Sequence, residues 1–373
     1  MYDIMEENMA GKYEVIRNEG GSAKPEDRLY YRTYIPASLT SIDYNQFVSS
    51  ELSSRLMAVY KEIGVLQGLA FHESNFSGKN RQFYKQEVIS LLENQDYQIS
   101  LTDIFSIQKS DNKKKYLSFY DCMENGNVPA ASEILLGKVK GKNQKFREKQ
   151  KWEETQIKRV SIRGYNPPAP GRISELMLDL YNYFRSENGE TDVIIKAGFL
   201  CYQFLTIMPY EENNEVWTSV LLNSFLREQG IGTNYYIPFA RYLFEKQDDK
   251  KRVMQKVREE CNYDIWIQFF LKILEQSYAR MNQTIMQLEI IEKDAYAVIS
   301  KEKSEKMLHD IIIFMEDNPI FVIGDIEKNF NTAYNTAAKF VGILEKNGLV
   351  REISDKQRYR IYVYEKYIKE ILK

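Results

Sequence analysis

One short polar loop gathers the side chains of this sequence that are best suited to chemistry. It runs from Met208 to Val216 and reads Met-Pro-Tyr-Glu-Glu-Asn-Asn-Glu-Val. Residues 211–215 offer three carboxylates and two amides, which are oxygen ligands that Mg²⁺ accepts. The loop could therefore bind a divalent ion or a cationic ligand, or it could be an ordinary solvated connection.

Histidine and cysteine chemistry is restricted by the composition. The chain has two histidines, so any mechanism built on several of them is excluded. His72, beside Glu73, could act as a displaced base, but a surface or helix-capping role fits its context better, and His309 is expected to be structural. The three cysteines lie far apart in apolar or helical contexts, which excludes a disulfide framework and a zinc knuckle. They are Cys122, Cys201 and Cys261.

Length and charge indicate the class of protein. The 373 residues are 43% hydrophobic and 28% charged, and 51 basic against 53 acidic residues leave a net charge of -2. A chain of this length is expected to form two or three modules, with no overall field that attracts nucleic acid or an anionic membrane. Neither a membrane span nor a secretory signal is evident, so we expect a cytoplasmic protein without a membrane partner.

The periodicity of apolar residues predicts a mainly α-helical bundle. The segment 193–207 is apolar nearly all round, which is typical of a central buried helix. It directly precedes the polar loop, and 217–227 is the helix expected after it. The other predicted helices are 43–70, 81–94, 112–124, 128–138, 172–184, 235–246 and 248–294. An extended stretch is expected at Tyr30–Pro36.

A basic segment interrupts the helices. Residues 138–159 carry nine basic and three acidic side chains, and a proline-rich stretch closes the region at Pro170. The alternation near Ile162 predicts a small hairpin or flap at about 144–162. This flap could be a solvated loop, or an edge that receives an acidic or extended protein partner.

The C-terminal region, 300–373, has the pattern of a winged helix-turn-helix. Helices are expected at 308–315, 323–330 and 332–347, and strands at 349–353 and 360–364. From Lys301 to the end, 13 basic and 12 acidic residues give a charge of +1, which favours protein docking or homodimer support over DNA binding. If DNA is bound, the expected contacts are Asn335, Thr336, Lys339, Arg358 and Arg360.

The polar loop resembles the motif of Fic proteins, which reads His-Pro-Phe-x-Asp/Glu-Gly-Asn-Gly-Arg between two helices. The lead-in Tyr202–Ile207 and the position of Pro209 match it, and further similar segments follow in order along the chain. These are Ala10–Tyr13, Tyr34–Pro36, Phe146–Arg147 with Trp152, Tyr165–Pro170 with Ser174–Met177, and Val257–Glu260 with Trp266–Leu271. The resemblance implies a Fic-type helical bundle with a β-hairpin flap and a winged helix. It assigns 1–125 to an N-terminal helical region, 126–295 to the core and 300–373 to the winged helix.

Family members typically transfer AMP from ATP to a protein hydroxyl, and two groups that this reaction needs are replaced here. The position of the general-base histidine is Met208, whose thioether cannot accept the hydroxyl proton. The phosphate-binding arginine position is Val216, and a second arginine position is Ser219. The resemblance therefore implies a fold without an efficient transferase.

Other motif positions are retained or only partly changed. Tyr210 keeps the aromatic ring, Glu212 keeps the carboxylate that would hold Mg²⁺, and Asn214 keeps a weak nucleotide contact. The two glycine positions are Asn213 and Glu215. Asparagine tolerates positive φ moderately and glutamate poorly, and Glu215 would also place a negative charge where a phosphate belongs.

The inhibitory helix of many relatives carries Ser-x-x-x-Glu-Gly, and the best match here is the segment from Glu73 to Gly78. Its glutamate position is Ser77. Loss of this glutamate together with its partner arginine is compatible with a site that no longer transfers AMP.

Three hypotheses follow. The first is a degenerate Fic-fold protein that acts as a binding or regulatory module, with no cofactor. The second is an active transferase that uses Mg²⁺ and ATP, with Glu212 as metal ligand and Glu211 or the target as base. The third is a DNA-binding regulator that acts through the winged helix.

Overall fold

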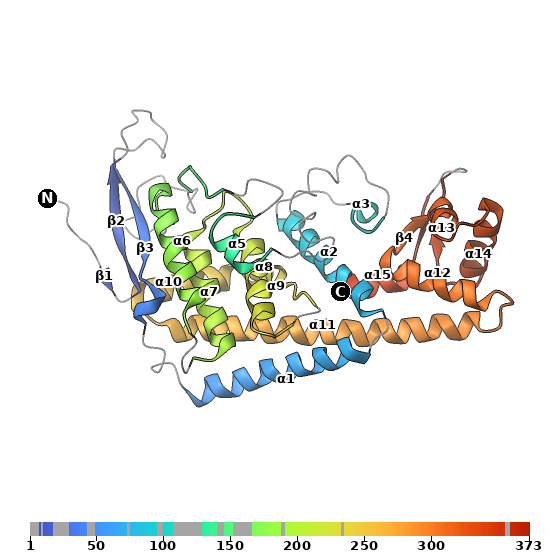
Figure 1. The fold of residues 1–373 in the computed structure, drawn as a ribbon, viewed down its shortest axis with the longest axis horizontal. Coiled ribbons are helices and arrows are strands. Elements are labelled where there is room, and N and C mark those ends of the chain that lie inside the picture. The colour runs from blue at the N-terminus through green and yellow to red at the C-terminus, as the bar shows by residue number, and fades with distance from the viewer. Residues whose placement is uncertain are drawn as a thin grey trace. The chain divides into compact units, whose positions relative to one another are not determined.

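The computed structural model describes most of the chain. The described residues are 7–8, 10–17, 30–42, 49–72, 75–94, 100–106, 129–139, 145–151, 166–187, 191–232, 235–354 and 359–373. They form a mainly α-helical protein with small antiparallel sheets, as predicted (Figure 1). The predicted helix 112–124 and most of the predicted flap lie outside these residues.

The helices divide between two compact units, with some helices shared. The first unit is 1–61, 128–233 and 242–276, and the second is 62–127, 234–241 and 277–373. The helices are α1 Ser50–His72, α2 Phe76–Asn94, α3 Leu101–Phe105, α5 Ala131–Leu135, α6 Pro170–Arg185, α7 Val193–Ile207, α8 Asn214–Glu228, α9 Phe239–Glu245, α10 Gln247–Glu260, α11 Tyr263–Ile299, α12 Glu305–Asp317, α13 Ile323–Asn329, α14 Tyr334–Lys346 and α15 Glu365–Leu372, with the 3-10 helix η2 at Leu39–Ser41.

An antiparallel sheet opens the first unit. Strand β2, Gly11–Arg17, pairs along its whole length with β3, Tyr30–Pro36, and the short β1, Glu7–Asn8, pairs with the start of β2. The extended stretch predicted at Tyr30–Pro36 is therefore confirmed as a strand. Strands β2 and β3 form an antiparallel pair near the N-terminus, at a different place from the predicted flap. Of that flap, the described residues 145–151 form neither helix nor strand.

Helix α7 is the buried centre of the first unit, as its sequence predicts. Every residue from Ile194 to Ile207 is buried, and the Asp192 side chain accepts the backbone N–H of Ile194 as an N-cap. At Gly198 an added Cβ would lie 2.9 Å from side-chain atoms of Ile267 and Phe270. Glycine is required here because α11 packs directly against the α7 backbone.

The prediction of one continuous helix at 248–294 is wrong. It is two helices, α10 and α11, separated at Cys261, which adopts a left-handed φ of 55°. The Cys261 N–H donates to Val257 O, which ends α10 with a left-handed cap. Apolar periodicity continues through such a break, so the pattern alone did not locate it.

The C-terminal region has all three predicted helices and both predicted strands. They are α12, α13 and α14, followed by β5 Arg351–Glu352 and β6 Ile361–Val363. Two elements were not predicted: β4, Ile320–Val322, which pairs with β6, and the final helix α15. The hydrophobic core of this region is continuous with residues of α2, α3 and the end of α11.

Candidate functional site

The motif loop leaves α7 through a left-handed residue and enters α8 through another. Met208 has φ 47° and ψ 61°, and its N–H donates to Phe204 O. Asn213 has φ 61° and ψ 34°, and its carbonyl accepts the first α8 bond, from the N–H of Trp217 at 2.9 Å. A non-glycine residue in this region costs about 1–2 kcal/mol, so other contacts must hold the loop in shape.

Buried Arg147 supplies much of that support. Its Nε donates to Met208 O at 2.8 Å, and its terminal nitrogens donate to Lys149 O at 3.0 Å and Pro168 O at 2.5 Å. Its backbone N–H also donates to Pro209 O at 2.8 Å. Arg147 is 4% exposed, and its guanidinium binds carbonyl groups in these contacts, so it caps the C-terminus of α7 and supports the motif loop.

The Asn214 side chain binds the backbone of the motif loop. Its Oδ1 accepts the backbone N–H of Tyr210 at 3.0 Å, and its Nδ2 donates to Tyr210 O at 2.8 Å. The Tyr210 ring is buried against Trp217, and its hydroxyl donates to Ile134 O at 2.7 Å. Burial raises the Tyr210 pKa, so this hydroxyl stays protonated as a donor. The asparagine kept from the motif therefore has a structural role in the loop.

Glu215 lies at the N-terminus of α8 and has a cationic partner. Its Oε1 lies 2.7 Å from Nζ of Lys250, and the two side chains are 21% and 6% exposed. Burial opposes the charged carboxylate, but the attraction of Lys250, its hydrogen bond and the backbone N–H of Glu215 outweigh burial and lower the Glu215 pKa. A carboxylate of the same chain therefore lies at the N-terminus of α8, the positive end of that helix.

The remaining motif positions divide into buried and exposed groups. Met208, Val216 and Ser219 are buried, whereas Glu211 and Glu212 are exposed. Among the residues that the structure describes, no three His, Cys, Asp or Glu side chains gather as a group able to hold a metal ion.

The two glycine positions of the motif behave differently. Asn213 has the left-handed backbone that favours glycine, as expected. Glu215 lies in the first turn of α8, where any L-residue fits, so a glutamate at this position causes no backbone strain.

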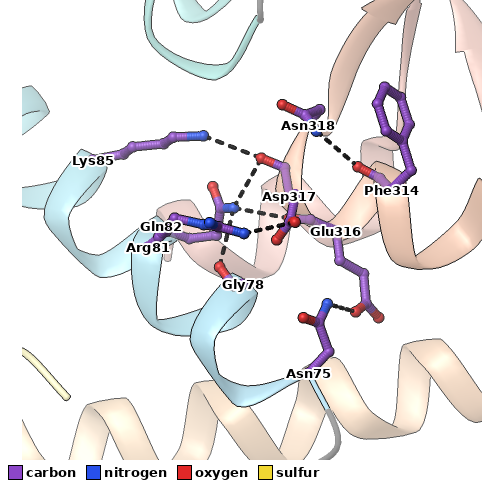
Figure 2. A network of polar contacts seen from close by, with 9 residues as sticks. All are labelled: Asn75, Gly78, Arg81, Gln82, Lys85, Phe314, Glu316, Asp317 and Asn318. Atoms are coloured by element: carbon purple, nitrogen blue, oxygen red, sulfur yellow. Dashed lines mark hydrogen bonds and ion pairs between the residues drawn. The ribbon is translucent and has the colours of Figure 1, made fainter. Parts of the chain in front are cut away.

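The segment that resembles an inhibitory helix begins α2. Ser77 is exposed in the first turn, and Glu73 and Ser74 lie outside the described residues. The neighbouring residues of α2 bind the C-terminus of α12 (Figure 2): Gln82 Nε2 donates to Glu316 O at 2.8 Å, and Arg81 pairs with Asp317 at 2.6 Å. In the second unit α2 is therefore a structural support for α12.

Four of the five residues predicted to contact DNA lie within the described residues, three on α14 and one beside β6. Asn335, Thr336 and Lys339 are exposed on α14, as such contacts require. Arg360 is exposed too, but it forms an ion pair with Glu352 at 3.3 Å. Arg358 lies outside the described residues, and DNA binding stays a prediction.

Two residues of the site were not identified as such from the sequence. Arg147 was noticed only as part of a segment near the flap, and Lys250 lies among other charged residues of α10. Their contacts join residues 61 and 35 positions apart. No local pattern distinguishes either residue from the other charged residues around it.

Comparison with solved structures finds a structural likeness. No protein-family model matches the chain. A crystal structure of a Fic family protein from Desulfovibrio desulfuricans G20 is similar, with 12% sequence identity and a TM-score of 0.45. The likeness covers 85% of this chain and 96% of the other. Within the described residues, every helix is too short or too polar to cross a membrane.

Proposed function

We propose that this chain is a Fic-like protein that has lost nucleotide transfer and acts as a binding or regulatory module. The observation that supports this most directly is the ion pair of Glu215 with Lys250. A carboxylate placed at the N-terminus of α8 competes with any phosphate for the same positive end of the helix.

The residues of the loop do not fit a magnesium nucleotide. Met208 offers no proton acceptor, Val216 offers no cation, and Asn214 uses both ends of its amide on the loop backbone. Glu211 and Glu212 are exposed carboxylates, but no three acidic, His or Cys side chains of the described residues gather as a metal site, and two carboxylates bind Mg²⁺ weakly without phosphate oxygens to complete the shell. We therefore derive no step through ATP or Mg²⁺.

The first experiment is calorimetric titration of the full chain with ATP and Mg²⁺, together with a transfer assay that uses labelled ATP. We expect neither binding nor transfer. If the wild type transfers label and Glu212→Ala abolishes this, the loop is an active site of unusual chemistry and the proposal is wrong. Glu260→Ala, at an exposed position of α10, is the matched control for loss of a carboxylate.

A second experiment restores the motif. The variant Met208→His, Asn213→Gly, Glu215→Gly and Val216→Arg is expected to gain ATP binding if decay is confined to these positions. The same variant with Glu215 retained is the control, and we expect it to bind ATP at least about tenfold more weakly because the carboxylate remains. Equal ATP affinity of the two restored variants would contradict the role given to Glu215.

A further inference from the structure

The segment that joins α13 to α14 carries positive charge and no negative charge. From Lys328 to Leu344 the sequence has two lysines, Lys328 and Lys339, and no acidic residue. Both lysines are exposed, whereas Glu327, directly before the segment, is half-buried. Two lysines without an acid give a local charge of +2, which the near-neutral sum over the whole C-terminal region does not show.

The acidic residues that follow this segment have arginine partners. Glu352 pairs with Arg360 at 3.3 Å, and Glu365 pairs with Arg351 at 3.2 Å. Glu345, near the C-terminal end of α14, also interacts with Arg360. Because arginines balance these acids, the net charge on the segment from α13 to α14 remains positive.

The fold exposes the N-terminal half of α14. Asn331 has a left-handed φ of 47°, and the N–H of Thr332 donates to Glu327 O at 3.1 Å, so the connection between the two helices is a tight turn. The residues of α14 that pack into the core are Ala337, Phe340, Val341 and Leu344. Its exposed residues in this half are Tyr334, Asn335, Thr336, Lys339 and Gly342. A helix-turn-helix enters the major groove of DNA with such an exposed second helix.

The exposed side chains of α14 are suited to base edges and phosphates. An asparagine such as Asn335 can bind adenine through two hydrogen bonds, and a lysine such as Lys339 can bind guanine or a phosphate. A Cβ added at Gly342 meets no atom within 4 Å, so the helix surface is open there and allows close approach. Within α14, which the structure describes throughout, Tyr334 is the one large apolar side chain that is exposed. Protein interfaces instead centre on a cluster of aromatic and apolar residues.

We propose that the exposed side of α14 binds duplex DNA in the major groove, with Asn335 at a base edge and Lys339 at a phosphate. Few phosphate contacts give weak non-specific affinity, so recognition depends on the bases. This inference goes beyond the proposed function. It is independent of nucleotide transfer, because the motif loop belongs to the first unit and α14 to the second.

Fluorescence anisotropy of the full chain with labelled duplexes of randomised sequence tests DNA binding. At about 50 mM KCl we expect dissociation constants of about 1–100 μM, which increase with salt. Lys339→Glu should weaken binding at least about tenfold and reduce the salt dependence, because repulsion replaces a phosphate contact. Lys369→Glu, at a 70% exposed position of α15, makes the same change of charge and should bind as the wild type does. Circular dichroism checks that both variants fold.

Selection of bound sequences from the same randomised pool tests base recognition. We expect the full chain to enrich one sequence. Asn335→Ala should bind that sequence about 5- to 150-fold more weakly than the wild type does, and unselected duplexes with unchanged affinity.

Four outcomes would overturn the proposal. The wild type could fail to bind duplex DNA up to about 100 μM, or could lose equal affinity through Lys339→Glu and Lys369→Glu. The selection could enrich no sequence, or Asn335→Ala could bind the enriched sequence as tightly as the wild type. None of these results alters the expected absence of AMP transfer, which is measured without DNA.

Discussion

The C-termini of α7 and α12 are both closed by side chains from distant parts of the chain, but by different chemistry. At α7 a single buried guanidinium, that of Arg147, donates to carbonyls of the loop and of Pro168. At α12 three side chains contribute: Gln82 and Lys85 donate to backbone carbonyls, while Arg81 binds the Asp317 carboxylate.

This difference indicates how each helix end would respond to a substitution. A cap that depends on one buried side chain is lost entirely with one substitution, whereas a shared cap loses only a part. The α7 end shapes the candidate site, so its dependence on Arg147 also makes the motif loop sensitive to a residue outside the motif. Two of the four predictions below test this comparison, and the other two test one ion pair in each unit; the largest expected effect comes first.

Arg147→Met is expected to destabilise the protein by about 3 kcal/mol or more, because several buried carbonyls lose their donor at once. Denaturant unfolding measures the effect. Arg185→Met, at an exposed position of α6, is the control and should change stability by less than about 0.5 kcal/mol. Equal midpoints for the two variants would show that Arg147 does not hold the loop.

Lys79→Met is expected to cost about 2–4 kcal/mol in the second unit. Lys79 is fully buried and pairs with Glu292 at 2.7 Å, so its removal leaves a buried carboxylate without its cation. Adding Glu292→Gln should recover part of the loss, which a double-mutant cycle detects. The exposed pair Lys293–Glu289 is the control, and Lys293→Met should have almost no effect on stability.

Gln82→Ala is expected to cost about 1–2 kcal/mol, since it leaves the α12 carbonyls without a buried donor. Arg81→Ala breaks an ion pair in the same network, but Arg81 is 46% exposed, and the cost should stay below about 1 kcal/mol. Thermal unfolding of both variants ranks them. A larger loss of stability in Arg81→Ala than in Gln82→Ala would show that the ion pair with Asp317, and not the hydrogen bonds to the backbone carbonyls, stabilises the end of α12.

Glu215→Gln is expected to cost about 1 kcal/mol at neutral pH, because it leaves Lys250 without its counter-ion. The Glu215 pKa is lowered in the folded state from a usual value of 4.5, so its contribution is complete above that pH. As pH falls through the folded pKa, the carboxylate is protonated and the contribution is lost. Urea unfolding at pH 7 and at successively lower pH should show the two proteins converge. A constant difference in unfolding free energy would contradict the ion-pair account.

The sequence by itself determined the elements whose patterns are local. The apolar residues of 193–207 cover the whole helix circumference, which identified the buried helix α7, and the spacing after Leu308 gave three helices and two strands correctly. It also located the polar loop between the two helices now seen as α7 and α8, because this depends only on residue type and order.

The tertiary structure decided what surrounds that loop. It brought Arg147 beneath Met208 and Lys250 beside Glu215, and it placed the Ser77 segment on a helix that supports α12. No local sequence pattern predicts these contacts, because each one depends on how elements far apart in the chain pack against one another. The left-handed break at Cys261 was missed for a related reason: hydrophobic periodicity reports which face is buried, and that face continues on both sides of the break.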